Sequence, residues 1–215
     1  MSISSAEEYL LELLNPSDEQ GKRKTALLQA TFDVIAELGF EGLRTRAVAD
    51  RAGVNVATLH YYFPGKQALI EGVAQFLGAK FVALHGPPPE PSGFAALDRL
   101  RQEFSDGRYY FDHEPDLLMV LQEFTMRGRR DPEVQKVVEM MYGHWRDNLE
   151  KMVRAGLAEG TFRSELDPEE TLAMLHCVFL GASTRQENDF GDVQRAVERW
   201  LLTEAIWQAT RGAEQ

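Results

Sequence analysis

Hydrogen-bonding and basic side chains gather in one short stretch of the sequence, between Thr45 and Lys66. Hydroxyl, amide, imidazole and phenol groups stand there beside cationic ones. Such groups bind phosphate oxygens and the edges of nucleic-acid bases through hydrogen bonds. The stretch therefore has the chemistry of a nucleic-acid contact surface, provided that the backbone presents these side chains together.

Two short helices joined by a tight turn are predicted for this stretch. Thr45 is a good N-cap residue, and apolar residues at helical spacing predict a first helix over residues 46–52. Gly53 accepts the left-handed backbone conformation that the turn needs. Asn55 can cap a second helix over residues 56–62. The pattern is typical of a helix-turn-helix motif.

The second helix is expected to have a core face and a reading face. Leu59 and Phe63 point inward, and the opposite face carries small and hydrogen-bonding side chains. A helix that enters a DNA major groove about 12 Å wide needs such a mixture, because small residues permit close approach while longer polar ones reach the bases. The predicted reading face consists of Val56, Ala57, His60 and Tyr61.

A phosphate-binding position is expected where the next helix begins. Pro64 breaks the second helix, and Gly65 and Lys66 open the following one. Backbone N–H groups at a helix N-terminus, the helix dipole and an ammonium group together favour a phosphate. The alternative interpretation is a small helical hairpin whose aromatic residues only build a core.

The same residues resemble the N-terminal signature of the TetR family of transcriptional regulators. The resemblance covers about residues 22–70. It rests on the motifs Thr45-Arg46, Ala49-Asp50-Arg51-Ala52-Gly53-Val54, Thr58-Leu59 and Tyr61-Tyr62-Phe63-Pro64-Gly65-Lys66. The resemblance implies a ligand-responsive, sequence-specific regulator that acts as a repressor and is released from its operator by a small effector.

The resemblance also implies roles for individual side chains. Arg46 matches a variable position on the first helix of the motif and would contact a base. Asn55 stands where serine is frequent and keeps the capping chemistry. Ala57 stands where glycine is frequent and His60 where tyrosine is frequent, which puts the operator sequence in doubt but not DNA binding. The positions that match the family's phosphate clamp are Thr45, Thr58, Tyr62 and Lys66.

The net charge of −11 is unusual for a DNA-binding protein, but the charges are segregated. Residues 21–66 contain seven basic and four acidic side chains, a local charge of +3, which leaves −14 for the rest of the chain. Attraction to phosphates acts over a Debye length of about 8 Å at physiological salt. The local sign at the reading surface therefore outweighs that of the distant acidic body.

The rest of the composition indicates a soluble, cytoplasmic protein without a membrane partner. A single cysteine, Cys177, excludes an intrachain disulfide and suits a reducing compartment. The first residues lack a basic leader. The longest nearly apolar run, around residues 172–182, is about half as long as a membrane span requires.

Helices are predicted along nearly the whole chain, so the expected fold class is all-α. Proline and glycine clusters mark their boundaries. Besides the two motif helices, helices are expected at residues 5–14, 19–38, 66–84, 94–111, 116–128, 132–157, 168–187 and 192–211. This makes about nine helices plus the short extra one at the N-terminus, and no segment reads convincingly as a strand.

A segment with four prolines, residues 85–93, interrupts the helices and is expected to be a linker. We expect a DNA-binding domain over residues 1–68, including the short N-terminal helix, and a helical effector-binding and dimerisation domain over residues 69–215. In the expected mechanism the linker lets the helix at residues 66–84 move when an effector binds. That movement would change the spacing of two reading heads on the DNA.

The last two predicted helices are apolar enough to pack against a second copy of the chain. The resemblance implies that they form a four-helix interface in a homodimer, which would place two reading helices on a pseudo-palindromic site in double-stranded DNA. An ordinary single-chain core is the alternative. The residues on which this interpretation depends are Leu172, Leu175, His176, Phe179, Leu180, Val193, Val197, Trp200, Leu201, Glu204, Ala205 and Trp207.

Aromatic, sulfur-bearing and polar residues of the middle helices are candidates for binding an apolar or amphipathic effector. Most residues of these types are simply core residues. The candidates are Phe76, Tyr109, Tyr110, Met119, Gln122, Glu123, Met126, Met141, Trp145 and His176.

A catalytic or metal-binding role finds little support. The sequence has no nucleophile elbow, phosphate-binding loop, dinucleotide glycine pattern or zinc-protease helix. No tight cluster of cysteines or carboxylates accompanies His113, His144 or His176. We expect no enzyme activity, cofactor or metal. Two alternatives stay open: a constitutive DNA-binding dimer without an effector, and a helical ligand-binding module or enzyme with a vestigial motif.

Overall fold

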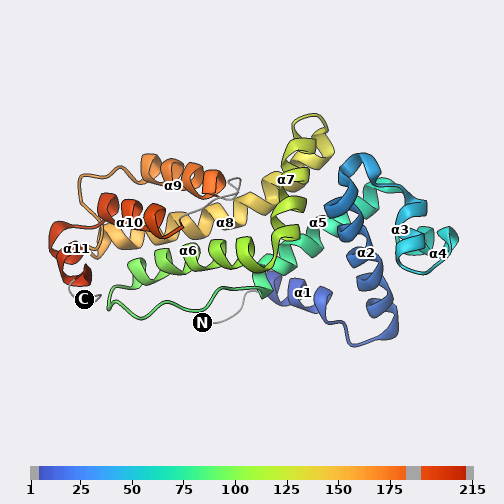
Figure 1. Cartoon of the computed structure of the whole chain (residues 1–215), viewed down its shortest axis with the longest axis horizontal. Coiled ribbons are helices and arrows are strands. Elements are labelled where there is room, and N and C mark those ends of the chain that lie inside the picture. The colour runs from blue at the N-terminus through green and yellow to red at the C-terminus, as the bar shows by residue number, and fades with distance from the viewer. Residues whose placement is uncertain (1–4, 183–189, 212–215) are drawn as a thin grey trace. The chain divides into compact units, whose positions relative to one another are not determined.

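The computed structural model describes residues 5–182 and 190–211, and helices account for most of them (Figure 1). The helices are α1 (Ser5–Leu14), α2 (Glu19–Gly42), α3 (Thr45–Arg51), α4 (Val56–Tyr62), α5 (Lys66–Ala83), α6 (Ala95–His113), α7 (Pro115–Gly128), α8 (Pro132–Ala158), α9 (Pro168–Ala182), α10 (Phe190–Leu201) and α11 (Glu204–Arg211). These residues contain no strand, and their one isolated β-bridge joins Phe162 to Leu202. The predicted fold class, all-α, is confirmed.

Contacts between the helices divide the described chain into two compact units. Unit 1 comprises the described residues of Met1–His85 and Glu114–Tyr142. Unit 2 comprises those of Gly86–His113 and Gly143–Gln215. The helix α7 belongs to unit 1, although it follows the linker in the sequence. None of the described helices combines the length and the apolar character that crossing a membrane requires.

Unit 1 is organised around the long helix α2, against which α3, α5 and α7 pack. Its predicted inward-facing residues, Leu27, Leu28, Thr31, Phe32 and Ile35, are all buried. Gly39 interrupts the helical backbone with φ 63°, close to where the sequence predicts the helix to stop. The short helix α1 packs along α5, and the Thr25 hydroxyl of α2 donates to the Leu13 carbonyl at 2.7 Å. The extra N-terminal helix is therefore part of unit 1.

The proline-rich linker is irregular, as predicted, but it is fastened to α6. The N–H of Gly86 donates to the Asp106 carboxylate at 2.9 Å, and the Ser105 hydroxyl donates to the Pro87 carbonyl at 2.7 Å. At the other end, the N–H of Ser92 donates to the Asp98 carboxylate at 2.7 Å. Both ends of the linker are thus held by side chains of α6, a point that the sequence pattern did not indicate.

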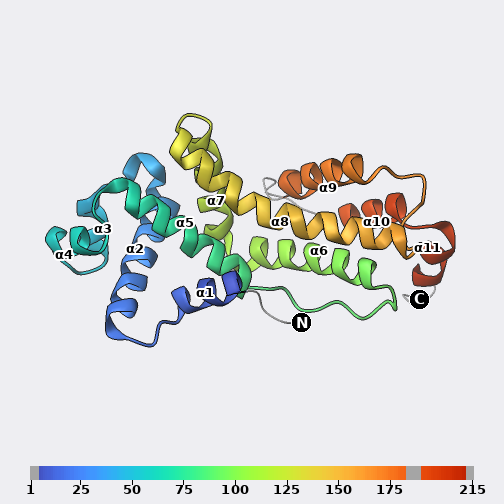
Figure 2. The ribbon, with the colours of Figure 1, turned by 180° about the vertical axis from the view of Figure 1, so that it is seen from behind.

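In unit 2 the helices α6, α8, α9 and α10 run side by side, as both Figure 1 and Figure 2 show. Their buried apolar residues form one core, in which Leu97, Phe104 and Leu175 are at most 1% exposed. Each helix contributes an apolar stripe to this core, and the burial of these stripes holds the helices together.

The single helix predicted over residues 192–211 is wrong, because the chain forms α10 and α11 instead. The Arg163 N–H donates to the Leu201 carbonyl at 2.9 Å, and the Thr203 N–H donates to the Thr161 carbonyl at 3.2 Å. The Arg163 guanidinium also donates to the carbonyls of Leu202 and Arg199. Thr161 and Arg163, nearly 40 residues earlier in the chain, thus bind backbone groups of residues 199–203 that would otherwise have continued the helix.

The other predicted boundaries lie within two residues of the observed ones, apart from α2 and α9. The helix α2 is continued past Gly39 by one further turn to Gly42. The helix predicted at 168–187 is observed to Ala182, and residues 183–187 lie outside the described residues.

Candidate nucleic-acid interface

The helices α3 and α4 are joined by a tight turn, as predicted. Gly53 has φ 67°, and the N–H of Val54 donates to the Ala49 carbonyl at 3.0 Å. The Asn55 side-chain oxygen accepts the N–H of Thr58 at 2.7 Å and is the N-cap of α4. These local bonds fix the angle at which α4 leaves the turn.

The start of α3 differs from the prediction. Thr45 is already in the helix, and the N-cap position is occupied by Arg44, which makes no side-chain cap hydrogen bond. The predicted capping role of Thr45 is therefore wrong. Leu43, which is 2% exposed, lies just before the extended residue Arg44, and the helix begins one residue earlier than predicted.

The helix α4 presents the predicted face to solvent. Leu59 and Phe63 are 1% and 4% exposed and fix the opposite face in the core. Tyr61 is 74% exposed, which is unusual for an aromatic side chain. On the predicted reading face, Ala57, His60 and Tyr61 are exposed and Val56 is half-buried. The arrangement leaves small and polar side chains accessible on one side of the helix.

The basic residues of the motif have different environments. Arg46 of α3 and Lys66 of α5 are exposed. Arg51 instead binds α2, because its guanidinium donates to the Glu37 carboxylate at 2.8 Å and lies 3.9 Å from the Asp33 carboxylate. The hydrogen bond from Arg51 lowers the pKa of the Glu37 carboxyl. Arg51 therefore fastens α3 to α2, while Arg46 and Lys66 project from the motif.

Lys66 is the first residue of the 18-residue helix α5. Gly65 occupies the N-cap position with φ 108° and, lacking a side chain, leaves the helix end open. The positive end of the helix dipole and the Lys66 ammonium have the same sign, so both attract an anion such as a phosphate. Thr58 and Tyr62 of α4, two other positions that match the family's phosphate clamp, are half-buried.

Comparison with protein families identifies the motif independently of this geometry. Residues 27–73 match the model for "Bacterial regulatory proteins, tetR family". Residues 111–208 match the model for "BetI-type transcriptional repressor, C-terminal". The chain belongs to the TetR family. The resemblance found at its N-terminus is confirmed, and TetR-family proteins are transcriptional regulators rather than enzymes.

This TetR-family chain is similar to the transcriptional repressor KstR from two organisms. It is 44% identical to KstR of Mycobacterium tuberculosis over 92 residues, which are 43% of this chain and 40% of that protein. It is 29% identical to KstR of Rhodococcus jostii over 116 residues, which are 54% of this chain and 45% of that protein. The chain thus spans less than half the length of these relatives.

A solved structure shows the same fold over most of the chain. A TetR transcription regulator from Haloarcula marismortui aligns with a TM-score of 0.71 at 20% identity, covering 85% of this chain and 99% of that one. The match supports the TetR fold and says nothing of a shared ligand.

The C-terminal part of this TetR-family chain contains an enclosed carboxylate that the sequence did not single out. The Glu103 side chain is 11% exposed, accepts the indole N–H of Trp145 at 3.0 Å and lies 3.1 Å from the Arg99 guanidinium. Burial raises the pKa of the Glu103 carboxyl, against the lowering effect of the Trp145 hydrogen bond. Trp145 lies 42 residues further along the chain, so no local pattern marks the pair.

Trp145, which binds this carboxylate, belongs to a series of aromatic ring contacts that joins three helices. The Trp145 ring centroid lies 5.3 Å from that of His176 and 5.8 Å from that of Phe179, and the Phe179 centroid lies 4.8 Å from that of Phe104. Burial, and to a lesser extent Arg146, lowers the pKa of His176. We call Glu103, Phe104, Trp145, His176 and Phe179 the aromatic cluster.

The predicted effector residues are distributed over both units. In unit 2, Trp145 and His176 lie in the aromatic cluster, and Tyr109 and Tyr110 are half-buried on α6. Burial, with the charges of Asp106 and Glu103, raises the pKa of Tyr110. The remaining candidates, Phe76, Met119, Gln122, Glu123, Met126 and Met141, belong to unit 1. Among these, Phe76 is 2% exposed, whereas Met119 and Met126 are 49% and 57% exposed.

Several apolar residues of the last helices lie in the core of a single chain. Leu172, Leu175, Val197, Leu201 and Trp207 are at most 6% exposed, so they are not available to a second copy. The sequence could not make this distinction, because an apolar stripe looks the same whether its partner is the same chain or another. The exposed residues of α9 are others: Glu169, Glu170, Ala173, Met174, Cys177 and Gly181.

Proposed function

We propose that this TetR-family chain is a ligand-responsive, sequence-specific repressor that reads DNA with α3 and α4. The observation that carries the proposal is the exposed face of α4, held rigidly by the Asn55 cap and the buried residues Leu59 and Phe63. A helix fixed in this way can enter the major groove without reorganising. A protein that binds chromosomal DNA acts in the cytoplasm, and we place it there.

Within this proposal, Arg46 contacts a base, and the α4 face of Val56, Ala57, His60 and Tyr61 reads sequence. Lys66, at the open end of α5, holds a phosphate together with Thr45, Thr58 and Tyr62. In the structure the Thr58 hydroxyl donates to the Asn55 side-chain oxygen at 3.0 Å. To donate to a phosphate, this hydroxyl must rotate, while the Thr58 N–H can keep the cap intact.

Selection of genomic DNA fragments by the purified protein tests this proposal. We expect a small set of pseudo-palindromic fragments to be enriched, and we expect their binding to weaken steeply with salt because phosphate contacts release counterions. Enrichment of no fragment over bulk DNA would refute sequence-specific reading.

We propose that the effector binds at the aromatic cluster of unit 2. Flat ring surfaces beside a carboxylate suit an amphipathic molecule, whose apolar part contacts Trp145 and Phe179 and whose polar part reaches Glu103. The Arg99 side chain, whose guanidinium pairs with Glu103, is 43% exposed. A ligand can therefore displace it from Glu103 at a modest cost in free energy. Candidate effectors are identified by a thermal-shift screen, with Trp145→Phe as the variant that should lose the response.

We also propose that the protein is a homodimer through α9 and the helices that follow it. The exposed residues Met174 and Cys177 lie one turn apart on α9, and Met174 is 54% exposed. In a two-fold interface the same face of α9 meets its copy. Because Cys177 is the only cysteine in the sequence, any disulfide-linked dimer joins Cys177 to Cys177.

Cross-linking and one charge substitution test this interface. We expect mild oxidation to give a covalent dimer that is absent from Cys177→Ser. Met174→Glu should shift the mass measured by light scattering toward the monomer, because two like charges would meet across the axis. The matched control is Met140→Glu on α8, which is 68% exposed and should leave the mass unchanged. A wild-type monomer at micromolar concentration would rule the dimer out.

A further inference from the structure

The last turn of α2, which follows Gly39, is held by α7 as well as by its neighbours in the chain. The Glu123 carboxylate of α7 accepts the backbone N–H of Phe40 at 2.9 Å. The Phe124 ring packs edge-on against the Phe40 ring, with centroids 5.0 Å apart, and the Arg127 guanidinium lies 3.9 Å from the Glu41 carboxylate. We call Glu123, Phe124 and Arg127 the α7 clamp. All of these contacts lie within unit 1.

The backbone of α2 creates the need for this clamp. Gly39 has φ 63° and ψ −177°, so the helix is broken there and the next N–H, that of Phe40, points away from the carbonyls of α2. A backbone N–H inside a protein needs an acceptor. Glu123 supplies it from 83 residues further along the chain. A Cβ on residue 39 would lie 3.0 Å from the Glu123 carboxylate, so the glycine also makes room for the clamp.

The held turn leads directly into the DNA-reading motif. Phe40 and Leu43 are 4% and 2% exposed, and the Leu43 N–H donates to the Phe40 carbonyl at 3.3 Å. Arg44 then takes the extended conformation that starts α3. The direction of α3 is therefore set by a turn whose backbone is held by a side chain of α7.

We propose that Glu123 is a positioning residue for DNA recognition: by holding the Phe40 N–H it fixes how α3 and α4 are presented. This inference rests on the proposed DNA binding and deepens it. The helix α7 begins two residues after α6 ends, and α6 carries Glu103 of the aromatic cluster. The chain therefore connects the cluster to the clamp through α6, Glu114 and α7. In this account Glu123 acts on the motif and not on the effector.

The effect of Glu123 on the turn can be measured without DNA. Amide hydrogen exchange of Phe40, followed by NMR, should be about tenfold faster or more in Glu123→Ala, because the N–H loses a charged acceptor. Glu123→Gln keeps an acceptor oxygen and should stay within about threefold of wild type. Asp116→Ala, an exposed acidic residue of the same helix, is the control and should leave Phe40 unchanged.

The effect on recognition is measured with operator variants whose half-sites are moved apart or together by single base pairs. Wild type, Glu123→Gln and Asp116→Ala should prefer one spacing, and Glu123→Ala should lose at least about threefold of that preference. A variant that is merely less stable but correctly positioned would keep it. If Glu123→Ala does not fold, Arg127→Ala is measured in its place, at a side chain 37% exposed, and should shift the preference in the same direction. This variant also loses the ion pair of Arg127 with Asp131 at 3.1 Å, so Asp131→Ala is its control.

The outcomes distinguish the positioning role of Glu123 from the proposed DNA binding. Unchanged Phe40 exchange in Glu123→Ala, or faster exchange with an unchanged spacing preference, overturns the positioning role. If wild type selects no DNA, the proposed function fails, whereas the Phe40 measurement still reports on the clamp. Faster exchange together with a loosened spacing preference, both restored by Glu123→Gln, supports the inference.

Discussion

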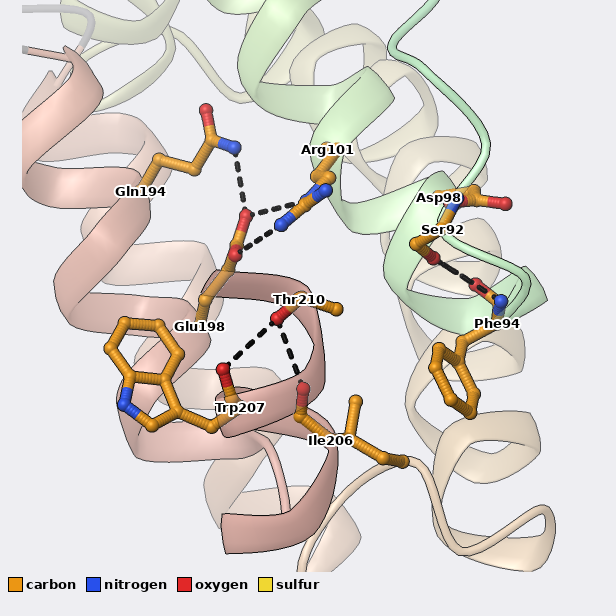
Figure 3. Close-up of polar contacts among 9 residues, drawn as sticks. All are labelled: Ser92, Phe94, Asp98, Arg101, Gln194, Glu198, Ile206, Trp207 and Thr210. Atoms are coloured by element: carbon orange, nitrogen blue, oxygen red, sulfur yellow. Dashed lines mark hydrogen bonds and ion pairs between the residues drawn. The ribbon is translucent and has the colours of Figure 1, made fainter. Parts of the chain in front are cut away.

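Glu198→Ala should lower the free energy of unfolding of unit 2 by about 3–5 kcal/mol, because it leaves a buried guanidinium without its carboxylate. The Arg101 guanidinium donates two hydrogen bonds of 2.9 Å to Glu198, and the two side chains are 15% and 5% exposed (Figure 3). The Gln194 side chain donates a third hydrogen bond to the same carboxylate at 2.8 Å. The pair joins α6 to α10 across the core of unit 2.

Urea unfolding followed by tryptophan fluorescence measures this effect. The three tryptophans, Trp145, Trp200 and Trp207, all belong to unit 2, so the signal reports on the unit that contains the pair. The control is Arg195→Ala, which removes an exposed pair with Asp192 on the same helix of unit 2 and should cost at most about 1 kcal/mol. A loss below about 1 kcal/mol for Glu198→Ala would show that Arg101 finds another partner or reaches water.

A double substitution separates the value of the pair from the cost of breaking it. Arg101→Met combined with Glu198→Leu removes both charges and keeps apolar volume, so it should recover most of the stability lost in Glu198→Ala. If the double variant is as unstable as the single one, the pair itself stabilises unit 2. Recovery would mean instead that the large effect comes from leaving the Arg101 guanidinium without the Glu198 carboxylate.

Arg46→Ala and Lys66→Ala should weaken DNA binding in two different ways. Arg46 is exposed on α3, and loss of a base contact there should cost about 1–3 kcal/mol on the preferred operator and relax the preference at one position. Lys66 lies at the N-terminus of α5, so its loss should weaken binding to all sequences and reduce the slope of log K against log salt by about one.

Binding measured by fluorescence anisotropy over a series of salt concentrations distinguishes these effects. Lys136→Ala, an exposed cation of α8 paired with Glu133, should change neither sequence preference nor salt slope measurably. The assignment of roles would be wrong if Lys66→Ala changed sequence preference, or if Arg46→Ala weakened operator and random DNA equally.

The motif could be predicted because its determinants are local. Gly53, Asn55 and Leu59 stand within seven residues of one another, and each acts on backbone or core only a few residues away. The residue type of Thr45 suits a cap position, but the structure has Arg44 at that position, next to the buried residue Leu43. That burial is a tertiary property, which the local pattern does not contain.

Contacts between distant segments explain what the sequence did not show. The break between α10 and α11 depends on Thr161 and Arg163, and the enclosure of Glu103 depends on Trp145. The type and position of Glu123 predict an effector residue, whereas in the structure its carboxylate accepts the Phe40 N–H. In each case the residue types were visible, and the partner, tens of residues away, was not.

The specificity ratio of wild-type binding is the most direct measurement of the central claim, that α3 and α4 read DNA sequence. Dissociation constants are compared at one fixed, near-physiological salt concentration for a fragment enriched from genomic DNA and for the same fragment with its half-sites scrambled. We expect the scrambled fragment to bind at least about 10³-fold more weakly. Equal affinity for both fragments, or no salt-sensitive binding to either, would contradict the account.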